Sequence, residues 1–417
     1  MNILFIVPYV PNQIRVRPYN LIRFLARRGH RVTLATLWTD EQEKQGLEEL
    51  RRDCQAVYAL PMPAWRSMWN CVAALPSSRP LQAAYSWNTE LAHQASQLAV
   101  GGNGKGTFDV VHVEHLRGVQ YGLYLKSQLA DAGRSVPVIW DSVDSISLLF
   151  RQAMVESKSF FSRSLTRFEL GRTERYEGWL LDRFDQVLVT SPADRKALTD
   201  LAPTAGQLPR VTVLRNGVDL GYFTPGDKAS REPASIVISG KMSYHANVAM
   251  ALNFIQQIMP LVWKQRPEVK VSIVGKDPAP QVQALGVDSR VEVTGTVSDI
   301  RPHLCSASLA AAPIAYGAGI QNKVLEAMAC GTPVVASSQA ISALEIVPGQ
   351  EVCVADTPVE FASAILNLLN DAPLRERLGD AGRSYVERNH DWYGVAGQLE
   401  LVYDQAIQGK RLAEKAH

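Results

Sequence analysis

The chain has 417 residues, of which 46% are hydrophobic and 20% are charged, and its formal net charge is +2. It has no apolar run long enough to cross a bilayer and no DNA- or RNA-binding motif, which argues against an integral membrane protein and against a nucleic-acid-binding protein. Its length exceeds the size at which a single hydrophobic core usually stops growing, so two domains are expected.

The cysteines and the N-terminus indicate the compartment. Five cysteines are scattered along the chain, without the Cys-x-x-Cys spacing of a metal or redox site. Such an odd, dispersed set argues against a disulfide framework and against a zinc site, and favours a reducing compartment. The first residues lack the basic region and cleavage site of a signal peptide. We therefore expect a cytoplasmic protein, and its more basic first half allows peripheral contact with the inner face of the membrane.

Apolar runs alternate with helical patterns along the chain, which predicts an α/β fold with doubly wound parallel sheets. In the first half, an amphipathic helix is expected over residues 19–28, with Gly29 at its end. The strands expected in this half cover residues 3–7, 31–36, 110–113, 136–140 and 186–190.

The strand pattern begins again near residue 236, after a segment rich in turn residues at 214–228. A domain boundary is therefore expected there, between a first domain over residues 1–215 and a second over residues 216–391. The strands expected in the second half cover residues 235–239, 270–274, 291–294, 309–314, 333–336 and 351–354.

The most informative segment, GAGIQNKVLEAMACG at residues 317–331, lies between two of these strands. A strand, a glycine-rich bend and a helix make an anion site, because backbone N–H groups and the helix N-terminus point to one place. Glycines such as Gly319 let the main chain approach a phosphate without a Cβ in the way. Lys323 and Glu326 are three residues apart and share one helix face, which offers a cation for phosphate and a carboxylate for hydroxyls. This combination suits a nucleotide sugar.

The sequence EAMACGTPVVAS at residues 326–337 closely resembles the signature of glycosyltransferase family 4. The resemblance implies a retaining enzyme of the GT-B fold, in which two Rossmann-like, doubly wound domains face a cleft. It also implies that a last helix, here residues 392–417, packs back on the first domain. In that family the glutamate at the place of Glu326 holds the donor ribose, and many members have a second glutamate where this chain has Ala318. The form GxGIQNKVLEAMA is similar to an exopolysaccharide-type subgroup that has a glycine-rich loop and a lysine instead.

The resemblance further implies which residues contact the donor. A Gly-Lys pair that reaches the diphosphate matches Gly240 and Lys241, and Asn247 stands where many members have another lysine, which Lys323 would replace. Loops after two later strands are expected to meet the base. In the first domain, the loop at residues 8–18 offers two arginines suited to phosphate, and the sequence does not choose between them. The expected donor-binding residues are Arg15, Arg17, Gly240, Lys241, Gly275, Val297, Gly319, Ile320, Gln321, Asn322, Lys323 and Glu326.

The segment DVVHVEHLRG at residues 109–118 ends a strand where relatives often have a His-x-His pattern, one histidine of which meets the donor sugar. Glu114 stands in the second histidine place, and His115 follows it; both are the expected catalytic residues. Glu114 would stabilise positive charge on the sugar or position the acceptor hydroxyl, and His115 would hold the sugar in the alternative register. A purely structural histidine is an equal alternative. Asp141 and Asp144, at another strand end, are expected on the acceptor side.

Residues 62–87 combine several aromatic side chains with two arginines. This mixture suits a segment that contacts a membrane, or a pocket for an apolar acceptor. A pair of helices packed into the core is the interpretation that the sequence favours.

These features predict a retaining glycosyltransferase that uses a nucleoside-diphosphate sugar, with UDP favoured over GDP. The expected acceptor is a cell-surface glycan, a lipid-linked precursor or a small molecule. Since the chain has no Asp-x-Asp motif, neither a metal nor another cofactor is expected. The alternatives are a GT-B sugar-nucleotide epimerase and a non-catalytic nucleotide-sugar or glycan-binding relative. A dinucleotide-dependent oxidoreductase is disfavoured, because Asn322 stands at the third glycine of GxGxxG.

Overall fold

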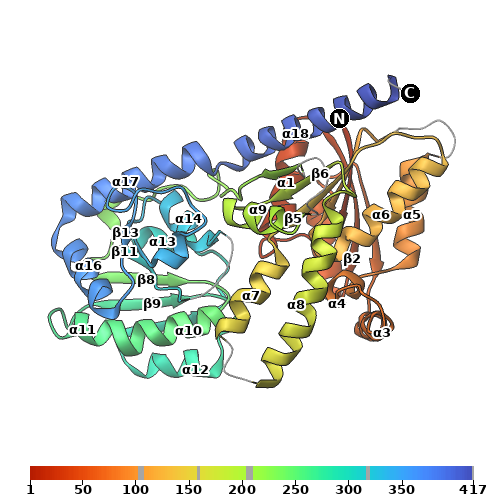
Figure 1. Cartoon of the computed structure of the whole chain (residues 1–417). Helices are drawn as coiled ribbons and strands as arrows, with labels where there is room; N and C mark the ends of the chain where they lie inside the picture. Colours follow the sequence, from red (N-terminus) through yellow and green to blue (C-terminus); the bar gives the residue numbers. More distant parts are fainter. Residues whose placement is uncertain (102–107, 157–159, 203–209, 316–319, 416–417) are drawn as a thin grey trace. The chain divides into compact units, whose positions relative to one another are not determined.

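The computed structural model describes residues 1–101, 108–156, 160–202, 210–315 and 320–415 (Figure 1). The chain forms two compact units. Unit 1 consists of Met1–Arg215 and Trp392–His417, and unit 2 consists of Asn216–Asp391. The chain therefore leaves unit 1 once and returns to it through its last helix.

Unit 1 is built on a parallel sheet whose described strands lie in the order β3-β2-β1-β4-β5-β6-β7. The first strand lies inside the sheet, and the chain fills one half before it crosses to the other, as in Rossmann folds. The strands are β1 (Asn2–Val7), β2 (Arg31–Trp38), β3 (Ala56–Pro61), β4 (Val110–Glu114), β5 (Val138–Val143), β6 (Gln186–Val189) and β7 (Val211–Val213).

Strand β1 shows why the first apolar run of the chain is unbroken. Leu4 and Ile6 belong to one hydrophobic cluster of unit 1, whereas Ile3, Phe5 and Val7 belong to another. Successive side chains of a strand point to opposite faces of the sheet, so both faces of β1 are covered. Burying each of these side chains contributes about 1.5–3 kcal/mol, which makes this strand a main source of stability for the unit.

Helix α18 (Trp392–Lys415) packs on α1 (Val16–Arg27). Its buried side chains recur three or four residues apart, as in Leu399 and Tyr403, and so form one apolar stripe. At the edge of this stripe, Arg28 donates from Nη2 to the carboxylate of Glu400 over 2.7 Å. The other helices of unit 1 are α2 (Glu41–Leu50), α3 (Ala64–Ala74), α4 (Leu81–Tyr85), α5 (Thr89–Val100), α6 (His115–Asp131), α7 (Ile146–Glu156), α8 (Phe160–Leu180) and α9 (Pro192–Thr199).

Unit 2 repeats this plan with the strand order β10-β9-β8-β11-β12-β13, again parallel wherever the structure describes a pairing. The strands are β8 (Ser235–Ser239), β9 (Lys270–Val274), β10 (Val291–Gly295), β11 (Leu309–Ala312), β12 (Val334–Ala336) and β13 (Cys353–Val354). The helices are α10 (His245–Asn253), α11 (Met259–Trp263), α12 (Pro280–Gln283), α13 (Arg301–Ser306), α14 (Asn322–Ala329), α15 (Ser338–Ile341), α16 (Pro358–Asn370) and α17 (Ala372–Asn389).

The predicted α/β class with two doubly wound sheets is confirmed, but two strands were missed. Strand β3 is at the edge of its sheet, and its residues are half-buried or exposed, so it lacks the apolar run of an inner strand. Strand β7 has only three residues, all half-buried. The strand expected over residues 309–314 ends earlier, at Ala312, since Pro313 has no N–H to continue the ladder.

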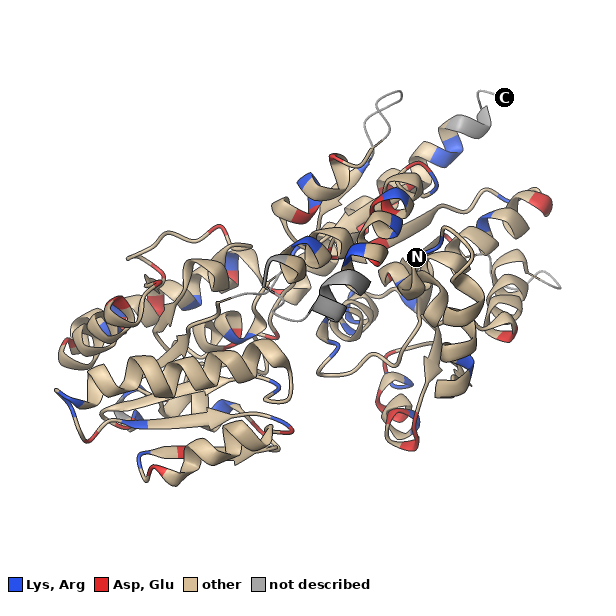
Figure 2. Ribbon diagram, turned by 60° about the horizontal axis from the view of Figure 1, so that its bottom comes forward, with Lys and Arg blue, Asp and Glu red and all other residues tan. Residues whose placement is uncertain are grey.

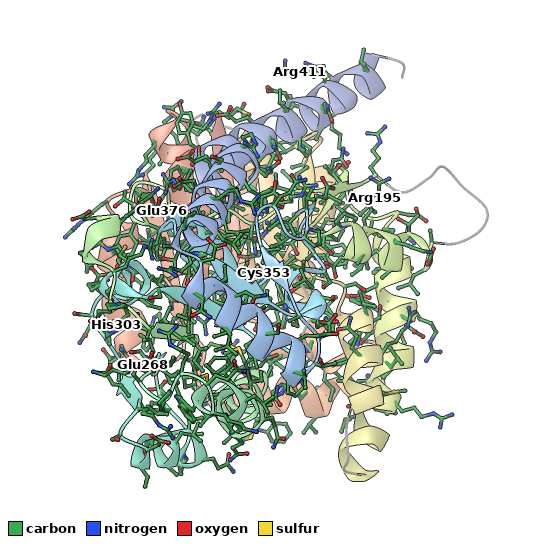
Figure 3. The ribbon with its side chains drawn as sticks, turned by 90° about the vertical axis from the view of Figure 1, so that its left-hand side faces the viewer. Arg195, Glu268, His303, Cys353, Glu376 and Arg411 are labelled. Carbon is green, nitrogen blue, oxygen red and sulfur yellow. The ribbon has the colours of Figure 1, made fainter. Side chains whose placement is uncertain are left out.

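Charged residues of both signs are distributed over the helices and loops of each unit (Figure 2). All five cysteines are free, including Cys353 on the edge strand β13 (Figure 3). Within the described ranges, no helix is both long and apolar enough to cross a membrane.

Candidate donor and catalytic sites

The sheet of unit 2 changes its winding direction at β8. Strand β8 lies between β9 and β11, so the connections after β8 and β11 run to opposite sides. Ligands of such sheets bind outside the carboxyl ends of the strands at this point. The segments that follow β8, β9 and β11 are therefore the first place to look for a nucleotide site.

A chain of hydrogen bonds connects two of these segments. Lys323, in the first turn of α14, donates from Nζ to Oδ1 of Asn247 over 2.9 Å and to Oε1 of Gln321 over 3.4 Å. The side-chain Nδ2 of Asn247 donates to the carbonyl oxygen of Lys241 over 3.0 Å. Asn247 is buried, while the side chain of Lys241 is exposed. The buried amide thus holds the ammonium of Lys323 close to the Gly240-Lys241 turn.

Glycines are required where these segments approach one another. A Cβ on Gly275 would lie 1.7 Å from the carbonyl oxygen of Gly240. A Cβ on Gly240 would lie 2.8 Å from Nδ2 of Asn247 and 3.3 Å from Cε of Lys323. Both glycines also have positive φ angles, 148° at Gly240 and 158° at Gly275. At Gly275 a side chain is excluded by the main chain of Gly240, and at Gly240 it would press on the side chains of Asn247 and Lys323.

We expect Gly275→Ala to destabilise unit 2 by about 1–3 kcal/mol, because the added methyl group forces the Gly240 turn to move. The same movement displaces the partners of Lys323 and should weaken nucleotide binding. Thermal unfolding and a binding titration with UDP measure both effects. Gly286→Ala is the matched control, since its Cβ would meet no atom closer than 3.7 Å. Equal behaviour of the two variants would contradict the steric explanation.

Helix α14 presents a cation and a carboxylate from neighbouring turns. Burial lowers the pKa of Lys323 to about 8, although Glu326 beside it acts in the opposite direction. Burial raises the pKa of Glu326 to about 7, against the opposing effect of Lys323. Among the described residues, the carboxylate of Glu326 has no hydrogen-bond partner, and neither has the buried Oδ1 atom of Asn322. These groups are available to a ligand that offers both negative charge and hydroxyl groups.

Unit 1 has the same winding point between β1 and β4, and acidic side chains lie there. Glu114 ends β4 and is paired in register with Asp141 of β5. The hydroxyl of Tyr9 donates to Oε1 of Glu114 over 3.2 Å, whereas the buried Oε2 has no partner in the described part of the chain. Burial, reinforced by the charge of Asp141, raises the pKa of Glu114 well above its ordinary value. Glu114 is therefore a carboxyl group that readily holds a proton.

His115 begins helix α6 directly after Glu114, with a φ angle of 62°. A non-glycine residue with such an angle is strained, and strain of this kind is concentrated at functional sites. The backbone N–H of Arg117 donates to Nδ1 of His115 over 3.3 Å. Burial and then the charge of Arg117 lower the pKa of His115 to about 3, so its ring is neutral at pH 7.

Arg17 and Asp141, predicted on the donor and acceptor sides, form an ion pair with each other inside unit 1. Arg17 donates from Nε to Oδ2 of Asp141 over 2.8 Å and from Nη2 to Oδ1 over 3.1 Å. It also donates from Nη1 to the carbonyl oxygen of Leu214 over 2.9 Å. Arg17 is 3% exposed and Asp141 is 0% exposed. Contact with a phosphate or an acceptor would first have to break this buried pair.

The other predicted residues of unit 1 lie closer to solvent. Arg15 is half-buried; it forms an ion pair with Glu43 over 2.8 Å, and its guanidinium lies 4.8 Å from the centre of the Tyr9 ring. Asp144 is half-buried and accepts a hydrogen bond from the hydroxyl of Thr190 over 3.1 Å. Burial, followed by the charge of Asp194, raises the pKa of Asp144 to about 6.

The chain matches the models of two known protein families. Residues 14–217 match the model of a glycosyl transferase 4-like domain, and residues 233–371 match the model of glycosyl transferases group 1. The first match covers most of unit 1 and ends just after the boundary at Arg215, and the second lies within unit 2. The chain belongs to glycosyltransferase family 4.

This glycosyltransferase is 29% identical over 315 residues to the MMP alpha-(1->4)-mannosyltransferase of Mycolicibacterium hassiacum, over 73% of this chain and 72% of the relative. It is 27% identical over 262 residues to the D-inositol 3-phosphate glycosyltransferase of Corynebacterium diphtheriae, over 55% of this chain and 58% of the relative.

Solved structures show the same architecture. HepE of Anabaena in complex with UDP and glucose has a TM-score of 0.65 and 16% identity, over 97% of this chain and all of HepE. Sucrose-phosphate synthase from Thermosynechococcus elongatus has a TM-score of 0.66 and 19% identity, over 98% and 100% of the two chains. The predicted GT-B fold is confirmed.

The structure of the glycosyltransferase brings together most of the residues predicted in unit 2. These residues lie at the carboxyl ends of β8, β9 and β11 or in the first turns of α14: Gly240, Lys241, Gly275, Gln321, Asn322, Lys323 and Glu326. Ile320 and Val297 pack against the core of the unit, and Gly319 lies outside the described residues. Tyr9 was missed, because an aromatic residue after a strand gives no sign that it bonds a carboxylate 105 residues later.

Proposed function

We propose that the glycosyltransferase transfers a sugar from a UDP-sugar to an acceptor with retention of the anomeric configuration. The arrangement at the start of α14 supports this proposal most strongly. The ammonium of Lys323 is held by Asn247, and the carboxylate of Glu326 is left without a hydrogen-bond partner among the described residues. A diphosphate and a ribose diol offer the complementary groups.

In this proposal, Lys323, Lys241 and the N–H groups at the start of α14 stabilise the diphosphate as it leaves. Glu326 accepts hydrogen bonds from the ribose hydroxyls. The bond between the anomeric carbon and the phosphate oxygen breaks, the acceptor oxygen bonds that carbon on the same face, and the acceptor proton passes to the leaving phosphate. The reaction then needs no nucleophile from the protein and no metal, so we expect full activity in the presence of a chelator.

Glu114 has a different role in this scheme. Burial raises the pKa of Glu114 and so favours its protonated form, which can donate a hydrogen bond to a hydroxyl of the sugar or of the acceptor. The hydrogen bond from the hydroxyl of Tyr9 to Oε1 orients this carboxyl group. The acceptor is a cell-surface glycan, a lipid-linked precursor or a small molecule, bound by unit 1.

Nucleotide binding is the direct test. At a hundredfold excess over Kd, UDP should raise the melting temperature by about 5 °C or more, since a ligand that binds only the folded state stabilises it. GDP should give a smaller shift, and NAD none. The absence of a shift with both UDP and GDP would contradict the proposal. A larger shift with GDP would contradict the choice of base.

A further inference from the structure

Helix α3 exposes its apolar face to solvent, whereas an ordinary surface helix buries that face. Trp65, Met68, Trp69 and Val72 are 59%, 63%, 66% and 54% exposed. Their spacing of three, four and seven residues places them on one face of the helix. The small polar Ser67 is only 3% exposed. The apolar stripe thus faces solvent and the polar side faces the protein. The core packing that the sequence favoured for residues 62–87 holds for Met62 and Ala83 but not for this stripe.

The rest of unit 1 holds this helix in place from its polar side. Asn70 donates from Nδ2 to the carbonyl oxygen of Trp87 over 2.9 Å. Arg172 of α8, which is buried, donates from Nη2 to the carbonyl oxygens of Ala74 over 2.7 Å and Ser77 over 2.8 Å. These bonds satisfy the end of α3 without covering its outer face. The exposed stripe is therefore part of a well-anchored element.

The charge and position of the stripe indicate what covers it. From Cys54 to Thr89 the sequence contains Arg66 and Arg79 but no aspartate or glutamate. Nearby, the guanidinium of Arg117 lies 4.9 Å from the centre of the Tyr85 ring. Helix α3 also follows the carboxyl end of β3. In a parallel sheet all strands have their carboxyl ends on the same side, so α3 begins on the side of the sheet where Glu114 ends β4.

We infer that the α3 stripe (Trp65, Met68, Trp69 and Val72) binds the surface of an anionic lipid membrane. Tryptophan side chains settle at the boundary between headgroups and acyl chains, and arginines in a segment that contains no acidic residue are attracted to anionic headgroups. A contiguous exposed apolar stripe of this kind marks an interaction surface. This inference rests on the proposed function. It also selects lipid-linked molecules as the acceptor class, because α3 begins on the side of the sheet where Glu114 ends its strand.

Flotation of the full chain with vesicles tests the inference. Vesicles of phosphatidylglycerol and phosphatidylcholine should carry the protein, whereas vesicles of phosphatidylcholine alone should not. The double variant Trp65→Ser/Trp69→Ser should bind about tenfold more weakly or worse, because it loses most of the inserted apolar area. Arg79→Gln should bind about fivefold more weakly. Trp179→Ser, which removes a half-exposed tryptophan of α8, is the matched control and should bind like the wild type.

Three results would overturn the inference. They are a wild type that stays with the soluble fraction, equal binding to both kinds of vesicle, and a stripe-dependent dimer in analytical ultracentrifugation. The last would show that a second copy of the chain covers α3. The melting-temperature shift with UDP is measured on the same preparations. It depends on unit 2, so failure of membrane binding and failure of nucleotide binding are distinguished.

Discussion

Lys323→Ala should lower kcat/KM for the nucleotide sugar by about a hundredfold to a thousandfold, the usual effect of removing one fixed charge from a developing anion. Its ammonium is held by Asn247 over 2.9 Å before any ligand arrives. A fixed cation of this kind needs little reorganisation as the diphosphate leaves. Loss of the ammonium should also weaken binding of UDP, which isothermal titration measures.

Two further variants show whether the effect belongs to this site. Glu326→Gln keeps the shape of the side chain but removes the charge that accepts from ribose, so it should raise KM more than it lowers kcat. Lys264→Ala removes an exposed lysine just after α11 and should leave kcat/KM unchanged. If Lys323→Ala behaves like Lys264→Ala, the assignment of the donor site to α14 is wrong.

The pH dependence of the wild type follows from the same two residues. Lys323 is protonated below its pKa of about 8, and Glu326 is ionised above its pKa of about 7. A plot of kcat/KM against pH, which reports groups of the free enzyme, should therefore fall on the acidic side near 7 and on the basic side near 8. Lys323→Ala should lose the basic fall, and its acidic fall should move to higher pH, because the charge that lowers the pKa of Glu326 is gone.

The inner strands and the site in unit 2 were predictable because their signals are local. The runs of β8 and β9 were predicted with their observed bounds, since strands covered on both faces read as continuous apolar segments. Lys323 and Glu326 were predicted as a pair because helix geometry alone places residues three apart on one face. The strands that were missed, β3 and β7, are short or half-exposed and leave no such run.

What the sequence did not show depends on contacts between distant residues. Arg17 and Asp141 are 124 residues apart, and nothing local indicates that they bind each other and not a ligand. The outward orientation of α3 likewise depends on Arg172 of α8, which bonds to carbonyl groups about 95 residues earlier. Aromatic residues at helical spacing are typical of a core, and only the fold reveals which side of the helix is covered.

Asp141→Ala should destabilise unit 1 by about 3–5 kcal/mol, since it leaves the buried charge of Arg17 without a partner. His112 adds to the loss: its Nε2 lies 3.5 Å from Oδ2 of Asp141, while its Nδ1 is 2.8 Å from the hydroxyl of Tyr403 on α18. The cluster therefore joins α1, β4, β5 and the last helix. Calorimetry should show a lower melting temperature for the transition that includes α18.

Acid should reveal the same ion pair in the wild type. Burial alone would raise the pKa of Asp141, but the charge of Arg17 and the hydrogen bond of His112 hold it below its ordinary value. A carboxyl group whose pKa is lowered by folding contributes its full stabilisation above the unfolded value of about 4, and loses it as the pH falls through the lower folded value. Asp141→Asn should lack this part of the acid dependence.

The double variant Arg17→Met/Asp141→Leu should recover much of the stability, because apolar side chains can replace a buried ion pair. If Asp141→Ala melts like the wild type, the pair contributes nothing, and Arg17 is available to a phosphate after all.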